Sequence, residues 1–461
     1  MEKTLQEIQM DINNIKIYMS KLYNNDIPVS IKYFRGENIK ISGRKMEFVH
    51  EGKLMEDFFK SNEKIIKNDY RVIVEQLTSY LLGKAPSITG VDAKLTNELP
   101  LKKAWRIAKK SLKQCQIQKI AWVQPFIDKF GNIDFTIHER SDNIIPIYSL
   151  DVDHTLLAVI RHYEVDIIVA GNIKTVTRIE YWDSEMVTYY KVDGKKAPVF
   201  WNVDEYVTIN PKPHVFTGVE YKNAPTVFKS TNNWGKVPFI PVQFNEEYQT
   251  ALQMVGKSKV DALDFLMSDG VNNLLDMADV IYILKDYIGK PEEALFNLKT
   301  KRAAVVGGGG DVKSLTTDIP IEARQKMISL MKEAIYTDGM GLDLSNLTGS
   351  SLTNEVLEAY FELLNMKANN VSPEIEKLYT ELLTFVDIKQ KGYPKQEDYE
   401  PIAEPTITFN KSVIINEIEY INASNTSAGF ISDETRWSWD PRVDDPKEEA
   451  KKMEDENPGL D

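Results

Sequence analysis

The sequence predicts an α+β protein, and two changes in the spacing of its apolar residues lead to this prediction. Apolar residues recur every three or four positions in the first ninety residues and again beyond residue 247, which is the period of a helix face. Between about residues 115 and 245 the period is two, as in strands that bury one face. The 461 residues suffice for about three structural units.

The composition narrows the class of protein. Hydrophobic residues make up 42% of the chain and the formal net charge is −13. This charge argues against a surface that binds nucleic acid all over, but not against a protein that surrounds DNA. Cys115 is the only cysteine, which excludes an internal disulfide framework and a thiolate-rich metal site and suggests a reducing compartment. We expect no signal peptide, and no apolar run reaches the length of about 18 residues that a membrane-spanning helix needs.

The N-terminal part is expected to be helical. Apolar residues from Leu54 through Tyr70 to Leu82 are spaced three and four apart, as on one helix face. Gly83 and Pro86 follow, and a glycine with a proline just beyond it commonly ends a helix.

The next part is expected to be antiparallel β structure. Residues 133–137 and 188–192 alternate apolar and polar side chains, and turns are expected at Gly131 and at Asp193-Gly194. A group of prolines from 211 to 241 closes this part, because proline is excluded from helix interiors.

Three longer helices are expected in the second half. The first covers about 247–280 and contains Gly270, where a bend is expected; the second covers 321–336. The third runs from about residue 354 to 388, and Ser372-Pro373 within it resembles a helix start, so we expect a kink or a restart there.

Two connections separate these helices. The first is a compact insert, with a strand at 280–284, a short helix at 291–299 and a strand pair around the glycines at 307–310. The second, residues 339–353, is a loop of Gly, Ser, Thr, Asn and Leu with a single acidic residue, Asp343.

Enzyme motifs are weak. The glycines at 307–310 lack the spacing to lysine that a phosphate-binding loop requires. Asp151 and Asp153 resemble the first motif of haloacid-dehalogenase-type phosphatases, in which one aspartate attacks phosphorus beside Mg²⁺. That fold needs alternating strands and helices, whereas the flanking sequence predicts antiparallel strands. The five histidines are scattered, so no zinc site is expected. We therefore expect a protein that is not an enzyme and needs no metal or cofactor, and we keep the phosphatase and a scaffold or adaptor without a channel as alternatives.

The order of several short segments resembles the portal proteins of tailed double-stranded-DNA bacteriophages, of the type found in long-tailed phages of Gram-positive hosts. The similar segments follow one another along most of the chain. They are Tyr33-Phe34-Arg35-Gly36, the block from Asn62 to Asn68 with Tyr80 to Pro86, Val237 to Val242 with Asn245-Glu246-Glu247, the segment from Asp261 to Asp286, and Thr317 to Pro320.

The resemblance implies a portal-type ring subunit with a fixed order of parts. These are a wing (residues 1–245, a helical part and an antiparallel β part), stem helix 1 (246–278), a small α/β clip (279–319), stem helix 2 (320–338), a tunnel loop (339–354), a long wing helix (355–388) and a mainly helical crown with a disordered acidic tail (389–461).

The same resemblance implies the function. It predicts a ring, usually dodecameric, at one capsid vertex, through which double-stranded DNA is packaged and later ejected without sequence-specific binding. The implied partners are the terminase large subunit, a head-completion or adaptor protein, and the major capsid and scaffolding proteins, with no membrane. The implied location is the virion, with assembly in the host cytoplasm.

Candidate site residues follow from this layout. A loop with almost no net charge suits a channel, because phosphate contacts would hinder the sliding of DNA. The tunnel-loop candidates are Gly341, Leu342, Asp343, Leu344, Ser345, Asn346, Leu347, Thr348, Gly349, Ser350 and Ser351. The candidates for basic residues that line the stem are Lys257, Lys259, Arg324, Lys326 and Lys332. The clip candidates for partner binding are Lys299, Lys301, Gly307, Gly308, Gly309 and Gly310.

Overall fold

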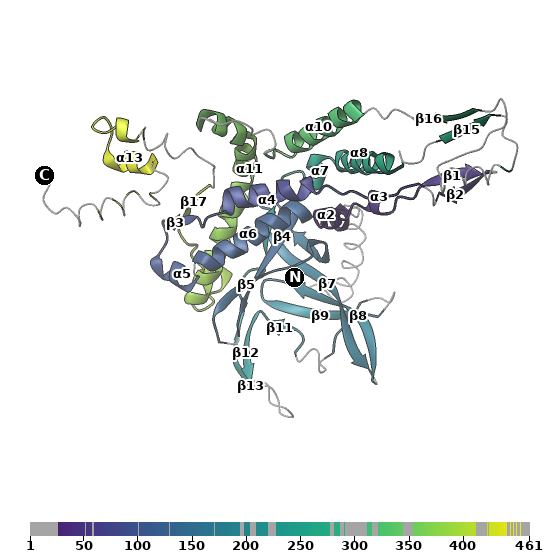
Figure 1. The fold of residues 1–461 in the computed structure, drawn as a ribbon. Coiled ribbons are helices and arrows are strands. Elements are labelled where there is room, and N and C mark those ends of the chain that lie inside the picture. Colours follow the sequence, from purple (N-terminus) through teal and green to yellow (C-terminus); the bar gives the residue numbers. More distant parts are fainter. Residues whose placement is uncertain are drawn as a thin grey trace. The chain divides into compact units, whose positions relative to one another are not determined.

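The fold is mixed helix and sheet, as expected for an α+β protein (Figure 1). It comes from a computed structural model, which describes residues 26–50, 52–57, 60–99, 101–128, 130–169, 171–193, 198–202, 209–219, 227–276, 281–285, 311–315, 321–343, 354–411 and 424–439, and single residues at 290, 422, 443, 446, 449 and 452. None of the helices within these ranges has the length and apolar character to cross a membrane.

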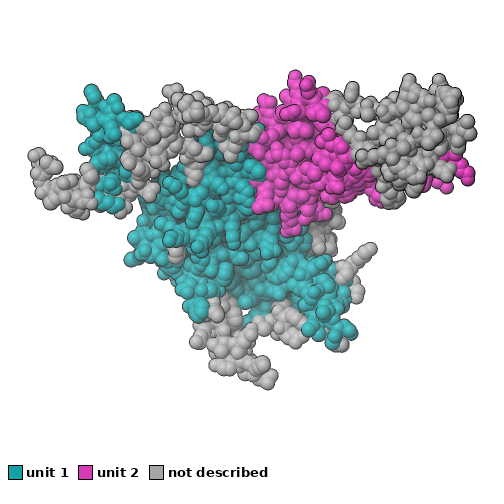
Figure 2. Space-filling model, viewed as in Figure 1, with its two compact units in different colours: residues 1–31, 72–254, 339–461 teal, residues 32–71, 255–338 magenta. Residues whose placement is uncertain are grey.

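The chain forms two compact units (Figure 2). The first unit contains Met1–Ile31, Val72–Met254 and Gly339–Asp461, and the second contains Lys32–Arg71 and Val255–Asp338. Each unit is therefore assembled from segments far apart in the sequence.

Helices form a large part of both units. Their bounds are α2 Asp26–Phe34, α3 Ile39–Ser42, α4 Asp69–Leu82, α5 Ala93–Glu98, α6 Leu101–Gln118, α7 Ala251–Val255, α8 Lys257–Asp276, α10 Ile321–Asp338, α11 Asn354–Gln390 and α13 Asp433–Trp439, with short 3-10 turns at Ser141–Asn143 and Gln396–Asp398. In the first unit α6 packs against β4 (Ile120–Ile127) and α11. Its buried face includes Ala108, Leu112 and Cys115.

The β-rich part of the first unit is antiparallel, as predicted. One sheet has the order β14-β4-β5, and a larger one has the order β10-β9-β8-β7-β6 with β11 paired to β9. Their other strands are β5 Ile133–Ile137, β6 Ile144–Tyr148, β7 Leu156–Val169, β8 Asn172–Trp182, β9 Met186–Val192, β10 Val199–Phe200, β11 Lys212–Pro213 and β14 Ile240–Gln243. Two-stranded pairs are formed by β12 Val215–Val219 with β13 Val227–Asn232 and by β3 Ser87–Thr89 with β17 Thr406–Thr408.

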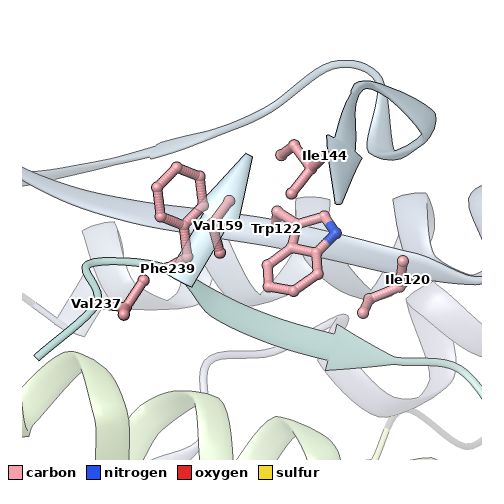
Figure 3. Close-up of a cluster of buried hydrophobic side chains, with 6 residues drawn as sticks. All are labelled: Ile120, Trp122, Ile144, Val159, Val237 and Phe239. Carbon is pink, nitrogen blue, oxygen red and sulfur yellow. The ribbon is translucent and has the colours of Figure 1, made fainter. Parts of the chain in front are cut away.

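A buried apolar cluster joins the two larger sheets (Figure 3). Trp122 lies at its centre and meets the ring of Phe239 edge-on, with 6.4 Å between ring centroids. Full burial of such side chains stabilises a fold by about 1.5–3 kcal/mol each. The cluster consists of Ile120, Trp122, Ile144, Val159, Val237 and Phe239.

The predicted N-terminal helix is wrong over its first part. Residues Glu47–His50 (β1) and Lys53–Glu56 (β2) form an antiparallel hairpin, and residues 61–67 are neither helix nor strand. The helix begins only at Asp69. Gly52 has a φ of 75° and supplies the hairpin turn, because this left-handed conformation suits glycine.

The first long helix in the second half is two helices. α7 ends at Val255, Gly256 has a φ of 86°, and α8 begins at Lys257. A side chain on Gly256 would be strained at this φ. The break therefore lies at Gly256, whereas α8 is continuous through Gly270.

The third helix continues through its proline. α11 is assigned without interruption across Pro373, so the expected restart is not observed. Proline lacks the N–H that would bond to the carbonyl of Asn369, four residues before. The Ser372 hydroxyl donates a hydrogen bond to that carbonyl (3.2 Å) and so satisfies it.

The described part of the insert is a single strand pair. β15 (Ile281–Lys285) pairs antiparallel with β16 (Asp311–Leu315). The expected helix at 291–299 and the glycines at 307–310 lie outside the described residues.

Candidate assembly and channel surface

An extended segment of the second unit is bound along α8 by a row of side chains. We call residues 61–67 the strap. Every second backbone N–H of the strap donates a hydrogen bond to a side chain that lies four residues from the next on α8. The pairs are Ser61 with Asp276 (2.9 Å), Glu63 with Asn272 (2.6 Å), Ile65 with Ser268 (2.9 Å) and Lys67 with Asp264 (2.8 Å).

The pairing follows from matching repeat lengths. Four residues of helix rise about 6 Å, and two residues of extended chain span about 6.6 Å. A polar side chain at every fourth helix position therefore meets every second N–H of an extended segment. Asn272 and Ser268 also donate to the carbonyls of Glu63 (3.1 Å) and Ile65 (3.2 Å). The strap thus gains the backbone partners that a helix would have given it internally.

A buried polar cluster lies at the N-terminal end of α8. The Tyr33 hydroxyl donates to Asp261 (2.5 Å), which also accepts from Lys257 (2.7 Å). Asn38 caps α3 and donates to Asp264 (2.8 Å). Burial, reinforced by Asp261, raises the pKa of Tyr33 to about 12, and burial raises the pKa of Asp264. These interactions fix the start of α8 against α2 and α3.

Arg324 connects α10 to α8. Its guanidinium pairs with Asp269 (3.4 Å), which also pairs with Arg44 (3.0 Å). A side chain on Gly270 would lie 3.4 Å from the Arg324 side chain, so glycine leaves room for this packing. Arg44 in turn lies over the ring of Phe265, 4.4 Å from its centroid.

Three of the five basic residues predicted to line the stem are neutralised within the subunit. Lys257 pairs with Asp261, Lys259 pairs with Asp338, and Arg324 pairs with Asp269. Their positive charges are therefore partly compensated within the subunit.

The other two basic residues of this set lie on α10. The Lys332 ammonium lies 5.7 Å from the ring centroid of Tyr336. Lys326 is exposed, with no ion-pair partner among the described residues.

Apolar side chains on α8 and α10 form two stripes that are partly exposed. Val260 and Leu263 begin the predicted apolar face of α8 and are buried, but Leu274 further along it is 58% exposed. On α10, Met327 and Leu330 are 45% and 46% exposed and lie three residues apart. We define the α8 stripe as Met267, Val271 and Leu274, and the α10 stripe as Ala323, Met327 and Leu330. Neither stripe includes the side chains that bind the strap or join α8 to α10.

The beginning of the predicted tunnel loop is held by side chains of the first unit. Gly341, Leu342 and Asp343 are described, and Leu342 is buried. Gln76 on α4 bonds to both backbone groups of Leu342, and Lys367 on α11 donates to the carbonyl of Gly339. The remaining loop candidates, Leu344 to Ser351, lie outside the described residues, as do the clip candidates Lys299, Lys301, Gly307, Gly308, Gly309 and Gly310.

The phosphatase motif forms no phosphatase site. β6 and β7 pair antiparallel on either side of it, whereas that fold needs a parallel strand followed by a helix. Asp151 and Asp153 lie in a turn closed by the hydrogen bond from the Ser149 N–H to the Thr155 carbonyl (2.8 Å). The structure therefore gives this alternative no support.

The comparison with known sequences identifies the class. The sequence profile of the family described as phage portal protein, SPP1 Gp6-like, matches residues 9–459. The chain belongs to this family. It is thus a phage portal protein, a virion component of a structural family whose members form rings in phage particles.

Individual relatives agree with this assignment. The portal protein of Bacillus phage SPP1 is 27% identical over 433 residues, which cover 92% of this chain and 82% of that protein. The portal protein of Clostridium phage phiCD119 is 24% identical over 418 residues, with coverages of 85% and 84%.

Solved structures of a gene transfer agent were also matched. They are a virion of the native particle (TM-score 0.42, 12% identity) and a neck of the empty particle (TM-score 0.43, 13% identity); each match covers 80% of this chain and 88% of the other.

Proposed function

We propose that α8 and α10 are the two stem helices of the ring, and that neighbouring copies pack the α8 stripe of one subunit against the α10 stripe of the next. The observation that carries this proposal is the partial exposure of the two stripes, in which Leu274, Met327 and Leu330 are about half exposed. A ring closed by rotation needs two different surfaces on each subunit that fit one another. Stripes on two separate helices meet that requirement.

Covering the exposed apolar side chains of the two stripes stabilises the proposed interface. Full burial of a leucine or methionine contributes about 1.5–3 kcal/mol. Leu274, Met327 and Leu330 are about half exposed, so covering them adds about 1 kcal/mol each at every interface. Several such contacts repeated around a closed ring favour assembly.

The channel proposal rests on the order of the parts and on charge. The ring, usually of twelve subunits in such portals, surrounds double-stranded DNA without sequence-specific contacts. Residues 339–354 form the tunnel loop, and residues 279–319 form the clip that binds the terminase large subunit and later a head-completion protein. The wing and crown meet the capsid and scaffolding proteins, and assembly takes place in the host cytoplasm. Neutralisation of Lys257, Lys259 and Arg324 supports weak contact with phosphate, because each free cation would add a salt-dependent attachment point.

Light scattering tests the ring directly. Twelve copies of the 52.8 kDa chain weigh about 0.63 MDa, whereas an adaptor without a channel would remain near one or two subunits. Leu274→Asp and Leu330→Asp should each shift the assembly to single subunits. The same substitution at Leu150, which is fully exposed in the first unit, should leave the ring intact. Rings of unchanged mass in both stripe variants would refute the interface.

The clip assignment has its own test. Replacing the four glycines from Gly307 to Gly310 by alanine, or reversing the charges of Lys299 and Lys301, should leave the ring intact and abolish binding of the packaging motor. Normal DNA packaging by these variants would refute the assignment of residues 279–319.

A further inference from the structure

The turn that follows α10 contains a residue in a strained conformation. α10 ends at Asp338, and Met340 has a φ of 47°. This left-handed region is unfavourable for a residue with a side chain, and such conformations persist only where the surroundings hold them. The boundary between the two compact units also falls between Asp338 and Gly339. The conformation of Met340 therefore requires partners that hold the backbone on either side of it.

A buried lysine holds one side of this turn. The Lys367 side chain comes from α11, is only 3% exposed, and donates a hydrogen bond to the Gly339 carbonyl (2.8 Å). Its ammonium also lies 5.8 Å from the ring centroid of Phe244. Burial lowers the pKa of Lys367 to about 7. A lysine is rarely buried to this extent, because removing its charge from water is unfavourable.

A glutamine holds the other side. Gln76 on α4 donates through Nε2 to the Leu342 carbonyl (2.6 Å) and accepts from the Leu342 N–H through Oε1 (3.0 Å). This two-bond pairing fixes the backbone of Leu342 in both position and orientation. The bonds at Gly339 and Leu342 thus enclose the strained Met340.

We propose that Lys367 and Gln76 form a two-sided clamp that imposes the strained turn at residues 339–342 and thereby fixes where the following loop begins. Both are positioning residues, because they act on the backbone of the turn. The importance of the clamp for DNA passage rests on the proposed function of that loop, but the clamp itself can be tested without DNA.

Hydrogen–deuterium exchange of the intact protein tests the clamp. Lys367→Met keeps a long apolar side chain and removes the donor, and Gln76→Leu keeps the approximate shape and removes both bonds. Lys377→Met is the matched control, since Lys377 is an exposed lysine on the same helix. We expect amide exchange in the peptide covering 339–343 to rise at least tenfold in the first two variants and to be unchanged in the control. The double variant should exchange less than the product of the two single effects, because either loss releases the same turn.

The outcomes separate the clamp from other roles. Unchanged exchange at 339–343 in Lys367→Met would mean that the lysine only fills space, and the proposal would be wrong. An equal rise across the whole of α4 and α11 would mean a loosened core, which also overturns it. Light scattering on the same samples reports the ring separately, so a failure of the proposed ring would appear in the mass and not in the local exchange.

Discussion

Asn272→Leu is the sharpest test of how the strap is attached to α8. The side chain of Asn272 is 1% exposed and makes two hydrogen bonds, one to each backbone group of Glu63, at 2.6 Å and 3.1 Å. Leucine has a similar size but can form neither bond. Each lost bond removes about 1 kcal/mol, and leaving partly buried backbone groups unpaired adds about 1–3 kcal/mol. We expect the strap to lose at least about 3 kcal/mol of local stability.

Amide exchange measures this loss where it occurs. Since every 1.4 kcal/mol corresponds to a factor of ten, exchange in a peptide covering the strap should become roughly a hundredfold faster. The peptide of α10 should change little, because the ion pairs that join α10 to α8, Arg324 with Asp269 and Lys259 with Asp338, do not involve Asn272. Ser258→Ala is the control, since Ser258 is exposed on α8 outside the row that binds the strap.

Two outcomes would contradict this attachment of the strap to α8. If Asn272→Leu speeds exchange of the strap no more than Ser258→Ala does, the strap is held by something other than these side chains. If the acceleration is the same in the strap and in α10, the substitution has destabilised the whole of the second unit, and the row of bonds has no separate role.

Three further outcomes are expected from denaturation experiments. Because burial lowers the pKa of Lys367 to about 7 from 10.5, the unfolded chain binds more protons between these values, so stability rises with pH there; Lys367→Met should remove this rise between about pH 7 and 10. Glu180→Gln should destabilise the first unit by about 2–3 kcal/mol, because this buried carboxylate neutralises two arginines of the larger sheet; an unchanged midpoint would contradict this. Pro373→Ala should stabilise α11 by less than the roughly 3 kcal/mol typical of an interior proline, because the hydroxyl of Ser372 already satisfies the freed carbonyl.

Sequence periodicity predicts an element well when the element needs only some apolar surface to cover one of its faces. β5 and β9 lie where the alternation of apolar and polar residues places them, because each strand buries one face whatever covers it. Periodicity gives the wrong structure for the strap and the hairpin before it. Leu54 and Ile65 fall at helical spacing, yet the backbone of the strap is satisfied by side chains about 200 residues further along the chain. Local spacing carries no information about such a partner.

The predicted site residues show a similar limit. Lys257 and Asp261 are four residues apart on α8, so their ion pair is visible in the sequence. The pair between Arg324 and Asp269 joins two helices and needs the fold. A list of basic residues on the predicted stem therefore overstates the charge that is left for DNA, and Lys326 is the member of that list whose charge remains exposed and without an ion-pair partner in the described chain.

In the second unit, the polar side chains and the apolar side chains differ in how far the subunit itself satisfies or covers them. Its polar groups are largely paired inside the subunit. Polar side chains of α8 form hydrogen bonds with the strap, and Asp269 forms ion pairs with Arg44 and Arg324. Its apolar groups are not covered to the same degree, since Leu274 and Leu330 remain about half exposed. Polar pairing of this kind fixes geometry but adds little net free energy, whereas uncovered apolar surface supplies a driving force for association. On the proposed interface, the polar pairs therefore hold α8 and α10 in place within one subunit, and neighbouring copies cover the two apolar stripes.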